Sequence, residues 1–136
     1  MISRDDFKAE VLRAVGTPVV HMGRIPGMAL DCVGLPWAAC NALGLALPAT
    51  NTYDGFPSED ALTDGLRSYC DEVSDPEDAH LWQVYVGRHA RHIVVPISDN
   101  QCGQPLVVHA WGHGKKVCRT IYDRVVAKRW RIRGVE

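Results

Sequence analysis

The sequence has no long hydrophobic run and no excess of charge of either sign. No apolar stretch approaches the roughly 20 residues that a membrane-spanning helix needs, so we expect no membrane insertion. The chain carries 15 Lys and Arg against 16 Asp and Glu, for a net charge of −1. This balance gives no general electrostatic attraction to nucleic acid. The last third is locally basic, and we interpret it as a solvated face.

The sequence also lacks the cysteine pattern of a disulfide-stabilised or zinc-ribbon domain. Its five cysteines are an odd number, and none of them form a Cys-x-x-Cys pair. This indicates reduced thiols. The first residues lack the charged-then-apolar layout of a secretory signal, so we expect a protein that is made in the cytoplasm. The length favours a single domain over residues 1–136.

Hydrophobic periodicity changes from helical in the first half of the chain to strand-like in the second half. Helices are predicted over 3–15, over 32–43 and from 58 to about 73. Strands are predicted over 81–86, 91–97, 106–111, 117–122 and 130–135. Helices followed by strands favour an α+β fold in which the N-terminal helices pack on a mainly antiparallel sheet.

The most informative stretch is the start of the second predicted helix. Asp31 is a good N-cap, because its carboxylate can accept hydrogen bonds from the amides of the first turn. Cys32 would then lie at the helix N-terminus, where unpaired N–H groups and the helix dipole favour a thiolate. The stretch therefore indicates a nucleophile, and the alternative interpretation of Cys32 is a small buried apolar residue.

A cysteine nucleophile needs a base, and two histidines lie in suitable places. His92 begins one predicted strand and His109 ends the next, and the two are nearly symmetric about the loop between them. In an antiparallel pair they would be close to cross-strand neighbours. One imidazole would take the cysteine proton, and the other would orient it. His113 is an alternative orienting residue, and we assign His21 and His80 to surface or loop positions.

With these residues in view, the chain resembles the NlpC-type papain-like cysteine peptidases of bacterial cell walls. The similarity is closest to the branch encoded with phage tail and gene-transfer-agent genes. Relatives often carry an aromatic residue after the Gly-Thr-Pro element, where this chain has Val19 and Val20. The matching elements are Gly16-Thr17-Pro18, Gly23-Arg24, Asp31-Cys32-Val33-Gly34-Leu35, Arg91-His92-Ile93-Val94, Val108-His109-Ala110 and the segment 130–133.

The resemblance implies a papain-like core and hydrolysis of peptidoglycan stem peptides, typically between D-γ-glutamate and meso-diaminopimelate. It implies that Cys32 is the nucleophile, His92 the general base and His109 the orienting residue. Asp31 would bind the free amine of the stem peptide. No cofactor or metal is needed. The resemblance also implies other phage-tail-type structural proteins as partners and incorporation into a virion or phage-like particle.

Three other functions stay open at this point. A catalytically inactive module of the same fold would contribute only contacts to a tail. A zinc-binding protein would use the histidine pairs 89/92 and 109/113 with Cys102, although their spacing matches no familiar structural zinc site. An acyltransferase would use the same three catalytic residues but pass the acyl group to an amine.

Overall fold

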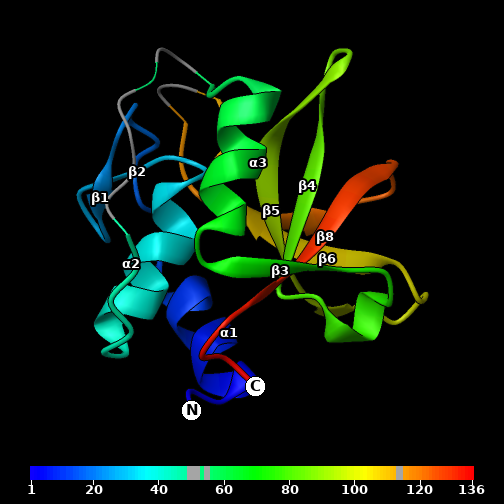
Figure 1. Ribbon diagram of the computed structural model, residues 1–136, viewed down its shortest axis with the longest axis horizontal. Coiled ribbons are helices and arrows are strands. Elements are labelled where there is room, and N and C mark those ends of the chain that lie inside the picture. Colours follow the sequence, from blue (N-terminus) through cyan, green and yellow to red (C-terminus); the bar gives the residue numbers. More distant parts are fainter. Residues whose placement is uncertain (49–52, 54–55, 113–114) are drawn as a thin grey trace.

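The structure is a computed structural model, and it describes residues 1–48, 53, 56–112 and 115–136 (Figure 1). These residues form an α+β fold, which confirms the predicted class. The helices α1, α2 and α3 lie together on one side of the main sheet, and the short β1–β2 pair lies beyond α2. In chain order the elements are α1 (Arg4–Arg13), β1 (Arg24–Ile25), β2 (Ala29–Leu30), α2 (Gly34–Ala42), α3 (Glu59–Arg67), β3 (Cys70–Val73), a 3-10 turn η1 (Pro76–Asp78), β4 (Leu81–Val86), β5 (His89–Asp99), β6 (Pro105–His109), β7 (Cys118–Ile121) and β8 (Val126–Ile132).

The main sheet has six strands in the order β3-β8-β4-β5-β6-β7, and every neighbouring pair is antiparallel. The last strand of the chain is therefore inserted between β3 and β4. The core between the helices and the sheet contains side chains from α1, α2, α3 and the central strands. A smaller cluster around Trp82, Val94 and Val107 includes residues of β4, β5 and β6.

The first and third helices begin as their sequences predict. Ser3 Oγ accepts from the Asp6 N–H at 3.0 Å, and Ser58 Oγ accepts from the Ala61 N–H at 3.1 Å. Each bond satisfies an amide that has no partner within its helix. The predicted helix from residue 58 to about 73 was too long, however. It ends at Arg67, and the segment Cys70–Val73 is strand β3, because pairing with β8 satisfies its backbone groups.

The last strand is displaced from its predicted position at 130–135. It covers Val126–Ile132, because it pairs with β4 and β3 on its two sides. Trp130 is fully buried there, and its indole N–H donates to Gln83 Oε1 at 2.9 Å. The Gln83 amide in turn donates to Thr63 and to the Ala90 carbonyl. This buried polar network ties α3 to three strands of the sheet.

His80 was expected at the surface or in a loop, and it lies in the bend that precedes β4 but not at the surface. Its side chain is buried at the start of β4. The Ile132 N–H donates to His80 Nδ1 at 2.9 Å, and His80 Nε2 lies 2.8 Å from the Glu136 carbonyl oxygen. Burial lowers the pKa of His80 to about 4, so the imidazole is neutral at neutral pH and has a partner on each ring nitrogen.

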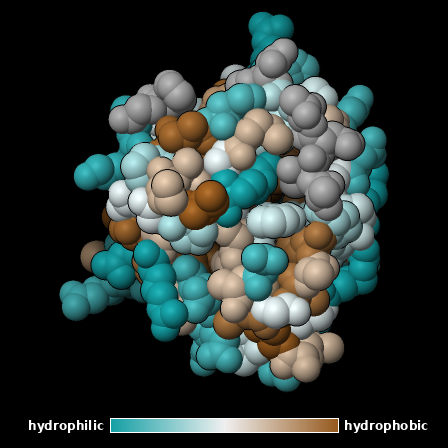
Figure 2. All heavy atoms as spheres, turned by 90° about the vertical axis from the view of Figure 1, so that its left-hand side faces the viewer, coloured by the Kyte–Doolittle hydropathy of each residue, from teal (hydrophilic) through white to brown (hydrophobic). Residues whose placement is uncertain are grey.

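The surface on the β1–β2 side alternates between apolar and hydrophilic residues (Figure 2). Ile25 and Met28, at the turn between β1 and β2, are 57% and 70% exposed. Within the described ranges, no helix is long and apolar enough to cross a bilayer.

Candidate active site

The candidate nucleophile Cys32 lies just before helix α2, at a helix start that Asp31 caps. The Leu35 N–H donates to the Asp31 carbonyl at 3.0 Å, and the Gly34 N–H donates to Asp31 Oδ1 at 2.7 Å. These bonds confirm the predicted cap, although regular helix begins only at Gly34. Gly34 has to be glycine, because a Cβ there would lie 2.0 Å from the carbonyl oxygen of Gly23. The glycine thus allows the preceding loop to pack directly on the helix start.

The Asp31 carboxylate is the centre of a network that holds this loop in place. Arg24 Nη1 donates to Oδ1 at 2.7 Å, and the Met22 N–H donates to Oδ2 at 2.9 Å. The Tyr53 hydroxyl also donates to Oδ2, and Arg24 Nη2 donates to the same hydroxyl at 3.1 Å. With the Gly34 amide, the carboxylate accepts four hydrogen bonds, which fills its usual capacity.

Sequence reasoning missed Tyr53, which lies in an irregular segment with no periodic pattern. Its hydroxyl reaches Asp31 from 22 positions away. Burial and the bond to Asp31 raise the pKa of Tyr53, and the phenol therefore stays protonated and donates.

The two predicted histidines are brought together. His92 Nε2 and His109 Nδ1 are 2.9 Å apart. The rings do not meet as a direct cross-strand pair, because Val95 pairs with Val108 and Pro96 with Val107. Continuing that register places His109 opposite Val94, so the imidazoles reach each other diagonally. His113, the alternative orienting residue, lies outside the described residues.

Two aromatic rings cover the histidine pair. Trp111 lies 5.0 Å from the His92 ring, centroid to centroid, and stacks on His109 at 6.4 Å. Phe56 contacts His92 edge-on at 5.7 Å and is itself tilted against Trp111. His92 is consequently only 2% exposed. Its Nδ1 atom is buried and has no hydrogen-bond partner within the described part of the chain.

Cys32 lies close to strand β5, but its neighbour there is Ile93, the residue that follows His92. The Ile93 backbone amide favours the thiolate form of Cys32, and both side chains belong to the same core cluster. In the strand register His92 pairs with Val84 and Ile93 with Gln83, so these neighbours point to opposite faces of the sheet. The structure therefore brings Cys32 to the backbone beside His92 without a hydrogen bond to its Nδ1.

The expectation of a stabilised thiolate at Cys32 is not met. Burial raises the pKa of Cys32, and the neighbouring Asp31 carboxylate raises it further. Burial and the nearby His109 lower the pKa of His92. Hydrogen bonds from the Ile93 and Cys32 amides favour the thiolate, but they do not offset the loss of water. At rest Cys32 is therefore a neutral thiol and His92 a neutral imidazole.

The neutral states of Cys32 and His92 predict how the alkylation rate of Cys32 depends on pH. In the ligand-free protein at pH 7, we expect Cys32 to react with iodoacetamide at least about tenfold more slowly than exposed Cys102, because each unit of raised pKa removes tenfold of the thiolate. The Cys32 rate should keep rising above pH 9. Peptide mapping by mass spectrometry follows both residues in one sample. A Cys32 rate that levels off below pH 7 would contradict the neutral pair.

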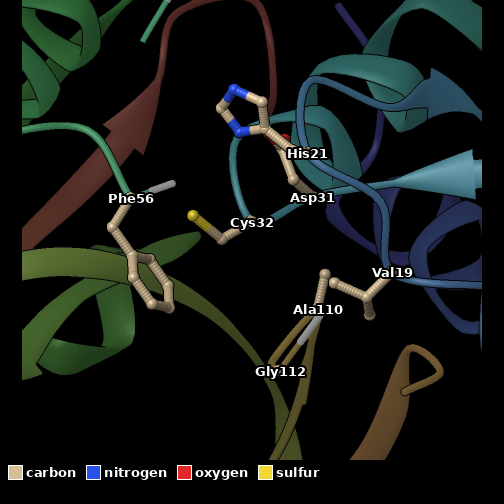
Figure 3. Close-up of a pocket in the computed structure, with 7 residues that line it drawn as sticks. All are labelled: Val19, His21, Asp31, Cys32, Phe56, Ala110 and Gly112. Atoms are coloured by element: carbon tan, nitrogen blue, oxygen red, sulfur yellow. The ribbon is translucent and has the colours of Figure 1, made fainter. Parts of the chain in front are cut away.

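A pocket of about 220 Å³ opens beside the cysteine. The sulfur of Cys32 points into it toward the side on which Phe56 lies (Figure 3). His21 and Gly112 lie on opposite sides of Cys32 in this view. The walls are mainly apolar, with one carboxylate and one imidazole, so the pocket suits a mixed apolar and polar ligand. Its lining residues are Val19, His21, Asp31, Cys32, Phe56, Ala110 and Gly112.

Of the residues proposed for a zinc site, His113 lies outside the described residues, and Cys102 lies apart from the described histidines 92 and 109. Cys102 is exposed in the loop between β5 and β6, at the far end of these strands from His92 and His109. Among residues 1–48, 53, 56–112 and 115–136, no group of three or more His, Cys, Asp or Glu side chains is arranged to hold a metal ion.

Comparison with known proteins adds no assignment to this geometry. No protein-family model matches the sequence, and no curated protein sequence matches it significantly.

Proposed function

We propose that this protein is a papain-like cysteine peptidase that hydrolyses peptidoglycan stem peptides, at the bond between D-γ-glutamate and meso-diaminopimelate. The observation that carries the proposal is the bond between His92 Nε2 and His109 Nδ1. When His92 Nε2–H donates to His109, the buried Nδ1 of His92 keeps a free lone pair. The substrate class comes from the resemblance of the Asp-Cys-x-Gly-Leu and histidine motifs.

In the proposed reaction, the Cys32 sulfur attacks the peptide carbonyl carbon while its proton passes to His92 Nδ1. The C–N bond then breaks, and the same proton goes to the leaving amine, which leaves a thioester on Cys32. A water molecule attacks the thioester, gives one proton to His92 and releases the acid, after which the thiol is restored. Backbone amides at the helix start, notably that of Cys32, would stabilise the oxyanion. His109 is a positioning residue in this scheme.

The scheme requires a local rearrangement. The Cys32 thiol contacts the Ile93 amide rather than His92 Nδ1, so the sulfur or the imidazole has to turn before the proton can pass. Asp31 lines the same pocket, and a substrate ammonium there would share the carboxylate with the four donors already in place.

The setting of the reaction is also part of the proposal. We propose that the protein acts within a phage tail or gene-transfer-agent particle, beside other tail-type structural proteins, and opens the cell wall locally. The resemblance carries this assignment.

One alternative is supported by a specific observation. Cys32 is only 4% exposed, and burial keeps its thiol protonated. These properties also fit a catalytically inactive docking module of the same fold, in which Cys32 and the histidines only fill the core.

A digest of the stem tetrapeptide L-Ala-D-γ-Glu-meso-diaminopimelate-D-Ala tests the proposal. We expect the wild-type protein to release L-Ala-D-γ-Glu, the Cys32→Ala variant to release none, and the matched control Cys102→Ala to retain activity, since Cys102 is exposed and distant from the site. Mass spectrometry identifies the products. Folded wild-type protein that cleaves nothing would favour the docking module, and cleavage by Cys32→Ala would exclude Cys32 as the nucleophile.

A further inference from the structure

The pocket beside Cys32 has a cation next to it that the proposed mechanism does not use. The Lys115 side chain lies along Gly112, which lines the pocket. A Cβ at Gly112 would lie 3.0 Å from Lys115 Cδ and 3.6 Å from Cε. Gly112 also has a positive φ of 81°, which favours glycine on conformational grounds. The absence of a side chain at Gly112 therefore lets the lysine stem pack close to the pocket.

The backbone of Lys115 is fixed to the pocket at two points. Its N–H donates to the Gly112 carbonyl at 3.0 Å, and its carbonyl accepts from the Val19 N–H at 2.8 Å. Both partners line the pocket. The Lys115 backbone is thus held beside two residues of the pocket wall, and its side chain is exposed.

Among the described residues, no acidic side chain pairs with the Lys115 ammonium. The carboxylate in the wall, Asp31, forms an ion pair with Arg24 at 2.7 Å, so these two charges largely cancel. Lys115 takes part in no ion pair or side-chain hydrogen bond within the described residues. The wall also contains the titratable side chains of Cys32 and His21, and His21 lies on the opposite side of Cys32 from Gly112 (Figure 3).

We infer that Lys115 recognises a carboxylate of the ligand that occupies this pocket, and that the pocket selects acidic peptides over neutral ones. The inference builds on the proposed function, because it takes the pocket as the substrate site. The Lys115 charge adds a positive potential beside a pocket whose walls are mainly apolar, and this potential favours a carboxylate over a neutral group.

Alkylation of Cys32 by a matched pair of small reagents tests this inference without a peptidase assay. Iodoacetate carries a carboxylate, and iodoacetamide is its neutral analogue of similar size. At pH 9 and low salt, we expect Lys115→Met to lower the ratio of the two Cys32 alkylation rates by about threefold to fivefold. Lys115→Arg should restore the ratio, because it keeps the charge. High salt should lower the wild-type ratio toward that of Lys115→Met.

The neighbouring Lys116→Met variant is the matched control. It removes the same charge one position away, and it should leave the ratio nearly unchanged, because the atoms nearest to a Cβ at Gly112 all belong to Lys115. Equal effects of the two lysine variants, no effect of either, or failure of both reagents to label Cys32 would overturn the inference. If the ratio shifts as expected but no stem peptide is cleaved, the anion site stands and the peptidase proposal fails.

Discussion

Replacing His92 with glutamine is expected to lower kcat for stem-peptide cleavage by about three orders of magnitude. General acid–base catalysis contributes about 10² to 10⁴ in rate, and burial of Cys32 makes the base more necessary by keeping its thiol protonated. Glutamine fills similar space and can still donate to His109, so the fold should persist. Release of L-Ala-D-γ-Glu measures the rate, and circular dichroism with thermal melting checks the fold.

The neighbouring histidines provide graded controls for this prediction. His89→Gln changes an exposed histidine of the same strand and should alter kcat by less than about twofold. His109→Asn keeps an acceptor for His92 Nε2–H and should cost about tenfold, whereas His109→Ala should cost about a hundredfold, because the imidazole loses its orienting partner. A folded His92→Gln variant that retains a tenth or more of wild-type kcat would mean that another group is the base.

Asp31→Ala is expected to lower the free energy of unfolding by about 3–5 kcal/mol, the typical cost of removing one partner of a buried ion pair. The substitution removes the acceptor for Arg24, whose side chain is only 17% exposed, and for the amides of Met22 and Gly34. It also removes the partner of the Tyr53 hydroxyl. Urea unfolding at pH 7, followed by tryptophan fluorescence, measures the loss.

A second ion pair in the same chain is the matched control. Asp71 lies 2.9 Å from Arg133, nearly the distance of the Asp31–Arg24 pair, but the Asp71 side chain is 66% exposed. Because water screens exposed pairs, Asp71→Ala should cost no more than about 1 kcal/mol. A loss below about 1 kcal/mol for Asp31→Ala would show that the four hydrogen bonds to Asp31 contribute little net stability. The role of the Asp31 carboxylate would then be ligand binding.

Local chemistry in the sequence was sufficient to place several parts of the site. Ser3 and Ser58 cap their helices because a hydroxyl accepts from nearby amides wherever the chain turns into a helix. Asp31 caps the start of α2 for the same reason, which places Cys32 at its entrance. The closeness of His92 and His109 follows from two strands joined by a short loop. These features depend on residues near one another in the chain, or on one antiparallel pairing.

Other features depend on contacts between distant segments, so only the tertiary structure decided them. A register shift between Pro96 and Ser98 places His109 opposite Val94, on the face of β5 that His92 shares, and side-chain alternation does not encode such a shift. Tyr53 and Phe56 reach the site from an aperiodic segment. The directions of the Cys32 and His92 pKa shifts depend on how completely other elements exclude water. The sequence by itself determined which groups are available at the site, and packing determined their protonation and their partners.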